Sequence, residues 1–355
     1  EKVNIKLNSC FYDAHENCET RVAMSDETSA LAHRSSLTDP ANLGKRACPK
    51  CRIKKTTVFT EGGARCWDCF ETSQFMLLKT TLSREKMVSY DATIGVALSG
   101  GVCSTALVLV LYQLLNVRAS SRTMKLRVFV FHVELPESIA GGFGGGSVVK
   151  EACRKVSQEC NFEFVSIPLE QKLIEAQQSV KDVSDKAVLV ESGIRSKLVE
   201  MALANQCKHV YLGASSTRLA ADVVSNVVKG KGYQLVGAAS DNIVGYMTLS
   251  HESDPSRATV ESSAVRFCRP FRDMTMRNAI RLGHHYGAIE ASCITKQQFF
   301  SGGSVADIDS LVNRFIAKLQ HDKISTSGIV VRTASKLKGS SNMSSTYYEE
   351  VDKRA

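Results

Sequence analysis

The sequence predicts an α/β protein: a Rossmann-like parallel sheet with helices on both faces, preceded by a small cysteine-rich segment. Runs of strand length, rich in β-branched and aromatic residues, alternate with runs of helical length. Each connection between successive strands is long enough for a helix, as parallel pairing requires. A Ser-Gly-Gly turn at 99–101 joins the first strand to its helix, and two cysteine pairs stand upstream of it.

Length and composition set the limits for function. A chain of 355 residues can hold one large α/β domain with appendages, or two domains. The net charge of +9 suits a polyanionic partner, and no run of about 18 apolar residues predicts a membrane span. The chain opens without a signal-peptide pattern, so we expect a reducing cytosol. There, twelve cysteines favour metal ligands and buried thiols over disulfides.

Composition divides the chain into four expected regions. Residues 1–46 are polar without a sustained period and are expected to be a disordered tail, in which Cys10 and Cys18 are free thiols or spare metal ligands. A cysteine-rich knuckle at 47–72 and an α/β domain at 73–334 follow. The polar stretch at 335–355 is expected to be a second disordered tail.

Two C-x-x-C pairs give the strongest local signal. Cys48 and Cys51 form the first pair, Cys66 and Cys69 the second, and fourteen residues separate the pairs. A hairpin of that length can bring four thiolates together, and four thiolates in a closed tetrahedron make a structural zinc site. Two disulfides are the alternative, which a reducing compartment disfavours. The knuckle is basic, which fits either a nucleic-acid contact or a solvated rim: Lys50, Arg52, Lys54, Lys55 and Arg65.

The elements of the α/β domain follow from apolar periodicity. Helices are expected at 70–87, 105–115, 148–160, 194–207, 218–228, 274–286 and 310–320, strands at 92–98, 125–133, 162–167, 209–213 and 324–333, and a flexible loop of five glycines at 141–147.

The turn after the first strand has the character of an anion site. Paired glycines let backbone amides approach a phosphate, and a helix N-terminus adds partial positive charge. It is neither a Walker loop, because no lysine follows, nor the G-x-G-x-x-G of a dinucleotide fold. An ordinary βα turn is the alternative. The segment resembles the Ser-Gly-Gly-x-Asp-Ser loop of the N-type ATP pyrophosphatases (PP-loop proteins). Ser99, Gly100, Gly101 and Ser104 match, and Cys103 stands where that family has Asp.

A second block, at 213–230, is similar to a strand-to-helix motif of tRNA-thiolating pyrophosphatases, Gly-His-Asn-x-Asp-Asp-x-x-Glu ending in Asn-x-x-(Arg/Lys)-Gly. The scaffold positions match: Gly213, Ala220, Asn226, Lys229 and Gly230. The polar positions do not: Ala214, Ser215, Thr217, Arg218 and Ala221. Carboxylates at the mouth of a phosphate site normally hold Mg²⁺. We therefore expect a degenerate nucleotide site that binds ATP poorly.

The chain departs from the catalytic thiolases at a third segment, one that concerns iron–sulfur binding. Catalytic tRNA thiolases of this group have a C-x-x-C just before a Gly-x-x-Arg helix, and the corresponding 189–195 segment has no thiol. Cys293 is a single cysteine, and an iron–sulfur cluster needs three or four, so we expect it to be a core thiol.

The ordered set of motifs from Cys48 to Lys336 resembles the cytoplasmic tRNA 2-thiolation protein 2 family. The resemblance implies a non-catalytic subunit that pairs as a heterodimer with a catalytic thiolase. That partner would convert the wobble uridine of tRNA to 2-thiouridine, in the 5-methoxycarbonylmethyl form, with sulfur from a thiocarboxylated ubiquitin-like carrier. Two alternatives remain: an active ATP-dependent tRNA sulfurtransferase that uses Cys103, and a free-standing RNA-binding zinc protein.

If the chain contacts tRNA, basic residues on the knuckle and near the degenerate site are the candidates. Arg269 has a structural alternative, because Phe267 and Phe271 suggest a buried strand edge. A wider alternative is that the positive charge serves only solubility. The candidates are Lys54, Lys55, Arg65, Lys229, Lys231, Arg269 and Arg272.

Overall fold

A computed structural model describes residues 47–60, 63–87, 92–117, 126–136, 145–170, 183–232, 242–247, 263–288, 308–322 and 326–337, with positions 175 and 235. The expected tail at 1–46, most of the expected tail at 335–355, and the thiols Cys10, Cys18 and Cys293 lie outside these residues. The chain divides into two units, Glu1–Ser73 and Gln74–Ala355.

The first unit contains a small antiparallel hairpin. Strand β1 (Val58–Thr60) pairs with β2 (Gly63–Arg65), with Val58 opposite Arg65. Helix α3 (Trp67–Arg84) begins directly after the hairpin and continues into the second unit.

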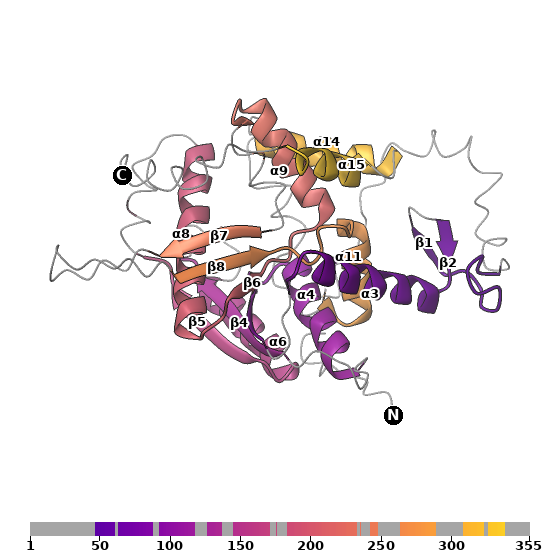
Figure 1. The fold of residues 1–355 in the computed structure, drawn as a ribbon, viewed down its shortest axis with the longest axis horizontal. Coiled ribbons are helices and arrows are strands. Elements are labelled where there is room, and N and C mark those ends of the chain that lie inside the picture. Colours follow the sequence, from indigo (N-terminus) through magenta and orange to yellow (C-terminus); the bar gives the residue numbers. More distant parts are fainter. Residues whose placement is uncertain are drawn as a thin grey trace. The chain divides into compact units, whose positions relative to one another are not determined.

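The second unit is built on a six-stranded sheet in the order β5-β4-β3-β6-β8-β7 (Figure 1). Five strands are parallel, and β7 pairs antiparallel to β8 at one edge. The strands are β3 (Thr93–Ala97), β4 (Arg127–Glu134), β5 (Glu163–Pro168), β6 (His209–Tyr211), β7 (Asn242–Met247) and β8 (Ser263–Cys268). The predicted parallel sheet is confirmed. Neither the antiparallel edge strand β7 nor its neighbour β8 was among the predicted strands.

Seven helices are described wholly within this unit. They are α4 (Val102–Tyr112), which runs on into a π-helical turn η3 (Gln113–Val117), α6 (Gly145–Glu159), α8 (Val183–Ala204), α9 (Ser216–Val228), α11 (Met276–His285), α14 (Ile308–Asp322) and α15 (Thr326–Ala334). None of the helices in the described part of the chain is long and apolar enough to cross a membrane.

Strand order places the candidate nucleotide loop at the switch point of the sheet. From β3 the chain moves outward to β4 and β5, and then returns through α8 to β6 on the other side of β3. Right-handed crossovers put helices on opposite faces when this direction reverses. The loops that follow β3 and β6 therefore diverge at the point where open α/β sheets bind ligands.

The core behind this point is densely packed. Phe129, Phe131 and Val133 alternate along β4 and pack with Leu198 and Met201 of α8 in one buried cluster. Gly95 of β3 leaves room for the Phe131 ring, because a Cβ at that position would lie 2.1 Å from a ring carbon.

Two sequence predictions are wrong. The run at 324–333 was expected to be a strand, because Ile329, Val330 and Val331 are β-branched, but 326–334 form helix α15. Its buried residues, Ser327, Val331 and Ala334, follow helical spacing, so packing outweighs strand propensity. The predicted glycine loop at 141–147 is also too long, since α6 begins at Gly145.

Candidate metal centre and nucleotide loop

Four cysteines of the first unit converge on one point. The sulfur atoms of Cys48, Cys51, Cys66 and Cys69, called here the cysteine cluster, lie within 4.8 Å of one another. Cys51 Sγ and Cys66 Sγ are 3.7 Å apart. A Zn–S bond of about 2.3 Å gives a tetrahedron with edges of about 3.8 Å. A four-iron cluster places each cysteine on a different iron and spaces the thiolates more widely. The cluster therefore fits a single tetrahedral ion.

Local backbone structure presents the two cysteine pairs. In the first knuckle, the Cys48 amide donates to the Lys54 carbonyl at 2.8 Å and the Arg52 amide donates to the Cys48 carbonyl at 2.7 Å. Arg52 takes a left-handed conformation, with φ 59°, to close this turn. In the second pair, Cys66 directly precedes α3 and Cys69 lies in its first turn. The candidate metal site thus depends on the hairpin, because the hairpin joins the turn of the first cysteine pair to the start of α3, where the second pair lies.

The electrostatic environment favours thiolates at the first knuckle. Backbone hydrogen bonds, chiefly from Cys51 and then from Cys66, lower the pKa of Cys48 to about 6. Backbone hydrogen bonds at Lys54 and Ile53 lower the pKa of Cys51 as well. Metals bind the thiolate and not the thiol, so this backbone prepares the first pair for a cation.

The basic residues of the knuckle are partly engaged within the first unit. Lys54 pairs with Asp68, and the ion pair is exposed. Lys50 Nζ and Arg65 Nη1 both donate to Ser73 Oγ, at 3.1 and 2.9 Å. Lys55 is exposed. Of the three predicted contacts in this unit, Lys54 and Lys55 are exposed and Arg65 is half-buried, and their contact with tRNA stays a prediction.

In the second unit, the stretch from Ser99 to Ser104, called here the serine–glycine loop, links β3 to α4. Gly100 has φ 79°, a left-handed conformation that only glycine adopts without strain. Ser99 Oγ and Ser104 Oγ are 3.1 Å apart, and Ser104 Oγ donates to the Gly101 carbonyl at 2.9 Å. Gly101 is the N-cap of α4 and makes no side-chain capping bond. A turn between a strand and a helix N-terminus can bind an anion, and that role of the serine–glycine loop stays a prediction.

The matched block after β6 packs directly against this loop. A Cβ at Gly213 would lie 2.7 Å from the Cα of Ser104, so only glycine permits the approach. Gly213 thus has a structural role, as its match to the sequence motif predicted.

Thr217 and Ala221, two of the positions expected to have lost Mg²⁺ ligands, are used for internal packing, whereas Arg218 is half-exposed and pairs with Asp222. Thr217 Oγ1 donates to Gln320 Oε1 of α14 at 2.9 Å and accepts the Met276 amide at 3.0 Å. Ser216 Oγ and Ser327 Oγ of α15 are 3.3 Å apart. Ala221 is buried against the apolar side chains of α14 and α15. Sequence analysis missed Gln320 and Ser327. Gln320 lies 103 positions after Thr217 and Ser327 lies 111 positions after Ser216, so no local signal links either pair.

Cys103 lies in the first turn of α4 but does not have the character of a nucleophile. Burial raises the pKa of its thiol to about 11. A sulfur nucleophile needs a lowered pKa. The protonated thiol weighs against the alternative in which Cys103 carries sulfur.

The basic candidates of the second unit serve mostly structural contacts. Arg269 and Arg272 are each only 5% exposed, which favours the structural interpretation for both. Lys229 is 14% exposed and pairs with Asp309 of α14. Lys231 is half-buried. The sequence pattern indicated the buried setting of Arg269, but gave no such signal for Arg272 or for the ion pair of Lys229.

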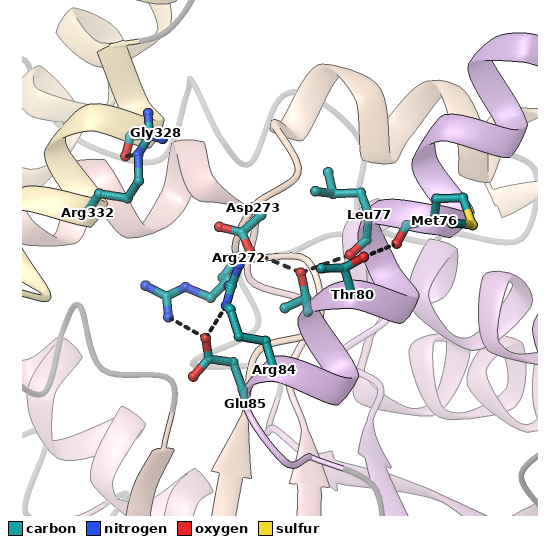
Figure 2. A network of polar contacts seen from close by, with 10 residues as sticks. Met76, Leu77, Thr80, Arg84, Glu85, Arg272, Asp273, Gly328 and Arg332 are labelled. Carbon is teal, nitrogen blue, oxygen red and sulfur yellow. Dashed lines mark hydrogen bonds and ion pairs between the residues drawn. The ribbon is translucent and has the colours of Figure 1, made fainter.

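Arg272 belongs to a network between the end of α3 and the loop after β8 (Figure 2). Arg272 lies 3.8 Å from Glu85, and Arg84 contacts both Glu85 and Asp273 at 2.6 Å. Thr81 Oγ1 also donates to Asp273 at 3.0 Å. The network ties the loop after β8 to α3.

Comparison with known proteins was made for both sequence and structure. No protein-family model matches the chain. A cytoplasmic tRNA 2-thiolation protein 2 of Arabidopsis thaliana is 25% identical over 334 residues, covering 85% of this chain and 67% of that protein. A protein of the same name from Drosophila yakuba is 22% identical over 315 residues, covering 83% and 73%. The chain is similar to the cytoplasmic tRNA 2-thiolation protein 2 family.

The fold agrees with this similarity. The U34-tRNA thiolase NcsA of Methanococcus maripaludis, solved with its 4Fe-4S cluster, superposes with a TM-score of 0.59 at 17% identity. The match covers 82% of this chain and 87% of the thiolase. The second unit therefore has the fold of a PP-loop tRNA thiolase, and the predicted fold class is confirmed.

Proposed function

We propose that this chain is the non-catalytic subunit of the cytoplasmic complex that 2-thiolates the wobble uridine of tRNA. It pairs as a heterodimer with a catalytic PP-loop thiolase, which adenylates the uridine and receives sulfur from a thiocarboxylated ubiquitin-like carrier. The names of the sequence relatives support the pathway and the cytoplasmic location. The chain itself stabilises the partner and extends its basic tRNA surface.

The single observation that most supports a non-catalytic role is the packing of the block after β6. Thr217 and Ala221 occupy positions where the resemblance expects Mg²⁺ carboxylates, and both are buried under α14 and α15. A hydroxyl bonded to Gln320 and a methyl group in an apolar cluster offer no ligand to a hard cation. ATP adenylation without its metal is therefore not expected from this chain.

The cysteine cluster supports the second part of the proposal. We assign it one structural zinc, because four sulfurs at tetrahedral spacing form a closed site with no open coordination position. Zinc here would supply folding free energy to a unit too small to form a large apolar core.

Purification of the full chain from its native cytosol tests the proposal. A catalytic PP-loop thiolase in stoichiometric amount is the expected companion, and its absence from the eluate would contradict the heterodimer. An ATP–pyrophosphate exchange assay on the chain alone tests the non-catalytic role, with no exchange expected. Robust exchange, abolished by Ser104→Ala, would replace the proposal with an active enzyme.

A further inference from the structure

Helix α14 has two apolar faces, and within the described part of the chain only one of them is buried. Val312 and Ile316 are buried against α9 and α15. Ile308, Leu311 and Phe315, called here the apolar stripe, are 37%, 46% and 55% exposed. Their spacing of three and four residues places them on one side of the helix. This spacing is typical of a seam that packs against another helix.

The helices that pack with α14 carry further exposed apolar side chains. Val227 and Val228 are 56% and 58% exposed at the end of α9, next to Lys229, which pairs with Asp309 in the first turn of α14. Ile329 of α15 is 52% exposed. Helices α14 and α15 both pack on α9, so these side chains belong to one three-helix group (Figure 1). Exposed apolar side chains gathered in this way mark an interaction surface.

The charged side chains around the apolar stripe are mostly basic. The exposed charged side chains described on α14 and α15 are basic: Arg314, Lys318 and Arg332. Lys336, two residues after α15, is exposed and basic as well. Among the side chains described on these two helices, Asp309 is the only acid, and it is bonded to Ser225 and Lys229. A second copy of the chain would bring this basic rim against itself across a two-fold axis. A complementary partner therefore has acidic residues beside its apolar seam.

We propose that the apolar stripe docks an amphipathic helix of the catalytic thiolase subunit, with Asp and Glu residues on that helix flanking the apolar seam. This docking site rests on the function proposed above. Aliphatic side chains dominate the surface, whereas RNA bases stack on aromatic rings, so a protein helix fits better than tRNA. Because the inner face of α14 holds Thr217 through Gln320, docking on the outer face would also fix the helix that covers the degenerate site.

The test measures affinity between the purified chain and the catalytic subunit. Leu311→Glu with Phe315→Glu places two charges in the docked seam, and we expect binding to weaken about 100-fold or more. A matched control exists outside the three-helix group. Met76 and Val148 are 60% and 53% exposed, so Met76→Glu with Val148→Glu makes the same chemical change elsewhere, and binding should not alter.

A second variant keeps the proposal testable if the first variant does not fold. Arg314→Glu with Lys318→Glu changes only exposed rim residues, and should weaken binding and reduce its salt dependence. Thermal unfolding of all variants confirms that each is folded.

The outcomes separate the docking site from the function. If wild type binds the catalytic subunit and both stripe and rim variants bind equally well, the docking site is wrong and the proposed function stands. If wild type does not bind the subunit at all, the proposed function fails and the docking site fails with it.

Self-association of wild type that the stripe variant abolishes would make a second copy the occupant. Loss of tRNA binding with intact subunit pairing would make RNA the occupant, and both results overturn the proposal.

Discussion

The cysteine cluster and the serine–glycine loop, two candidate binding sites, differ in which of their expected parts are present. At the cysteine cluster, all four ligand atoms converge within 4.8 Å. At the serine–glycine loop, the backbone turn and the close approach of Gly213 are kept, while Thr217 and Ala221 pack against α14 and α15. A preserved turn therefore does not by itself preserve a site.

The difference has a physical origin. Metal affinity depends on side-chain donors, and loss of one thiolate from a closed tetrahedron removes the site. A phosphate turn depends on backbone amides, and most side-chain changes leave it standing. A nucleotide loop can accordingly survive as scaffold after its chemistry is lost, whereas a structural metal site is kept whole or not at all.

The largest expected effect is at the cysteine cluster. Cys48→Ser with Cys66→Ser should reduce the metal content from about one ion per chain to nearly none, because two thiolates cannot hold a closed site. Mass spectrometry of the metals measures this and distinguishes zinc from iron. Cys103→Ser removes a thiol outside the cluster and should leave the content unchanged. Equal metal in the double variant and the wild type would refute the site.

A second test asks whether the side chains near the serine–glycine loop now form part of the apolar core. Ala221→Glu would bury a carboxylate among apolar side chains, since Ala221 is 3% exposed. We expect a loss of about 3 kcal/mol or more in the free energy of unfolding and no gain of ATP–pyrophosphate exchange. Asn313→Glu, at an exposed position of α14, should change stability by less than about 0.5 kcal/mol. A tolerated Ala221→Glu that gained exchange would mean that the site had only lost its ligands.

The basic surface of the first unit allows a third test. Lys54→Glu with Lys55→Glu should weaken tRNA binding by the heterodimer and reduce the salt slope by about 0.7 to 0.9 for each lost phosphate contact. Lys155→Glu with Lys208→Glu makes the same charge change on exposed residues of the second unit. Titrations at two salt concentrations compare the pairs. If both pairs weaken binding equally, net charge accounts for the effect and the knuckle makes no specific contact.

The smallest expected effect concerns Cys103. Burial raises the pKa of its thiol from 9.0 to about 11, so the reactive thiolate forms only at high pH. Alkylation by iodoacetamide, followed at the Cys103 peptide by mass spectrometry, should reach half its maximal rate near pH 11 in the folded chain and near pH 9 in the unfolded chain. A folded-state midpoint below the unfolded one would restore Cys103 as a candidate nucleophile.

Sequence predicted the features that depend on neighbours in the chain. The convergence of the four cysteines was predictable because two pairs with fixed spacing lie on a short hairpin, and that they bind a metal stays a prediction. The serine–glycine loop was predictable because it spans six residues. Features that depend on distant contacts were not predictable. The helical state of 326–334 comes from packing of Val331 on α9, and the edge strand β7 from pairing with β8. The burial of Arg272 likewise depends on the folded chain, whereas Phe267 and Phe271 had already suggested a buried setting for Arg269. Contact of the basic residues with tRNA stays a prediction.

Reconstitution of tRNA thiolation tests the central claim most directly. The full chain and the catalytic subunit are assayed separately and together for 2-thiouridine formation with ATP, tRNA and the thiocarboxylated carrier. A non-catalytic partner gives no product alone, raises product formation by the catalytic subunit, and retains this effect in the Cys103→Ala and Ser104→Ala variants. Product formed by this chain alone and lost in either variant would contradict the account.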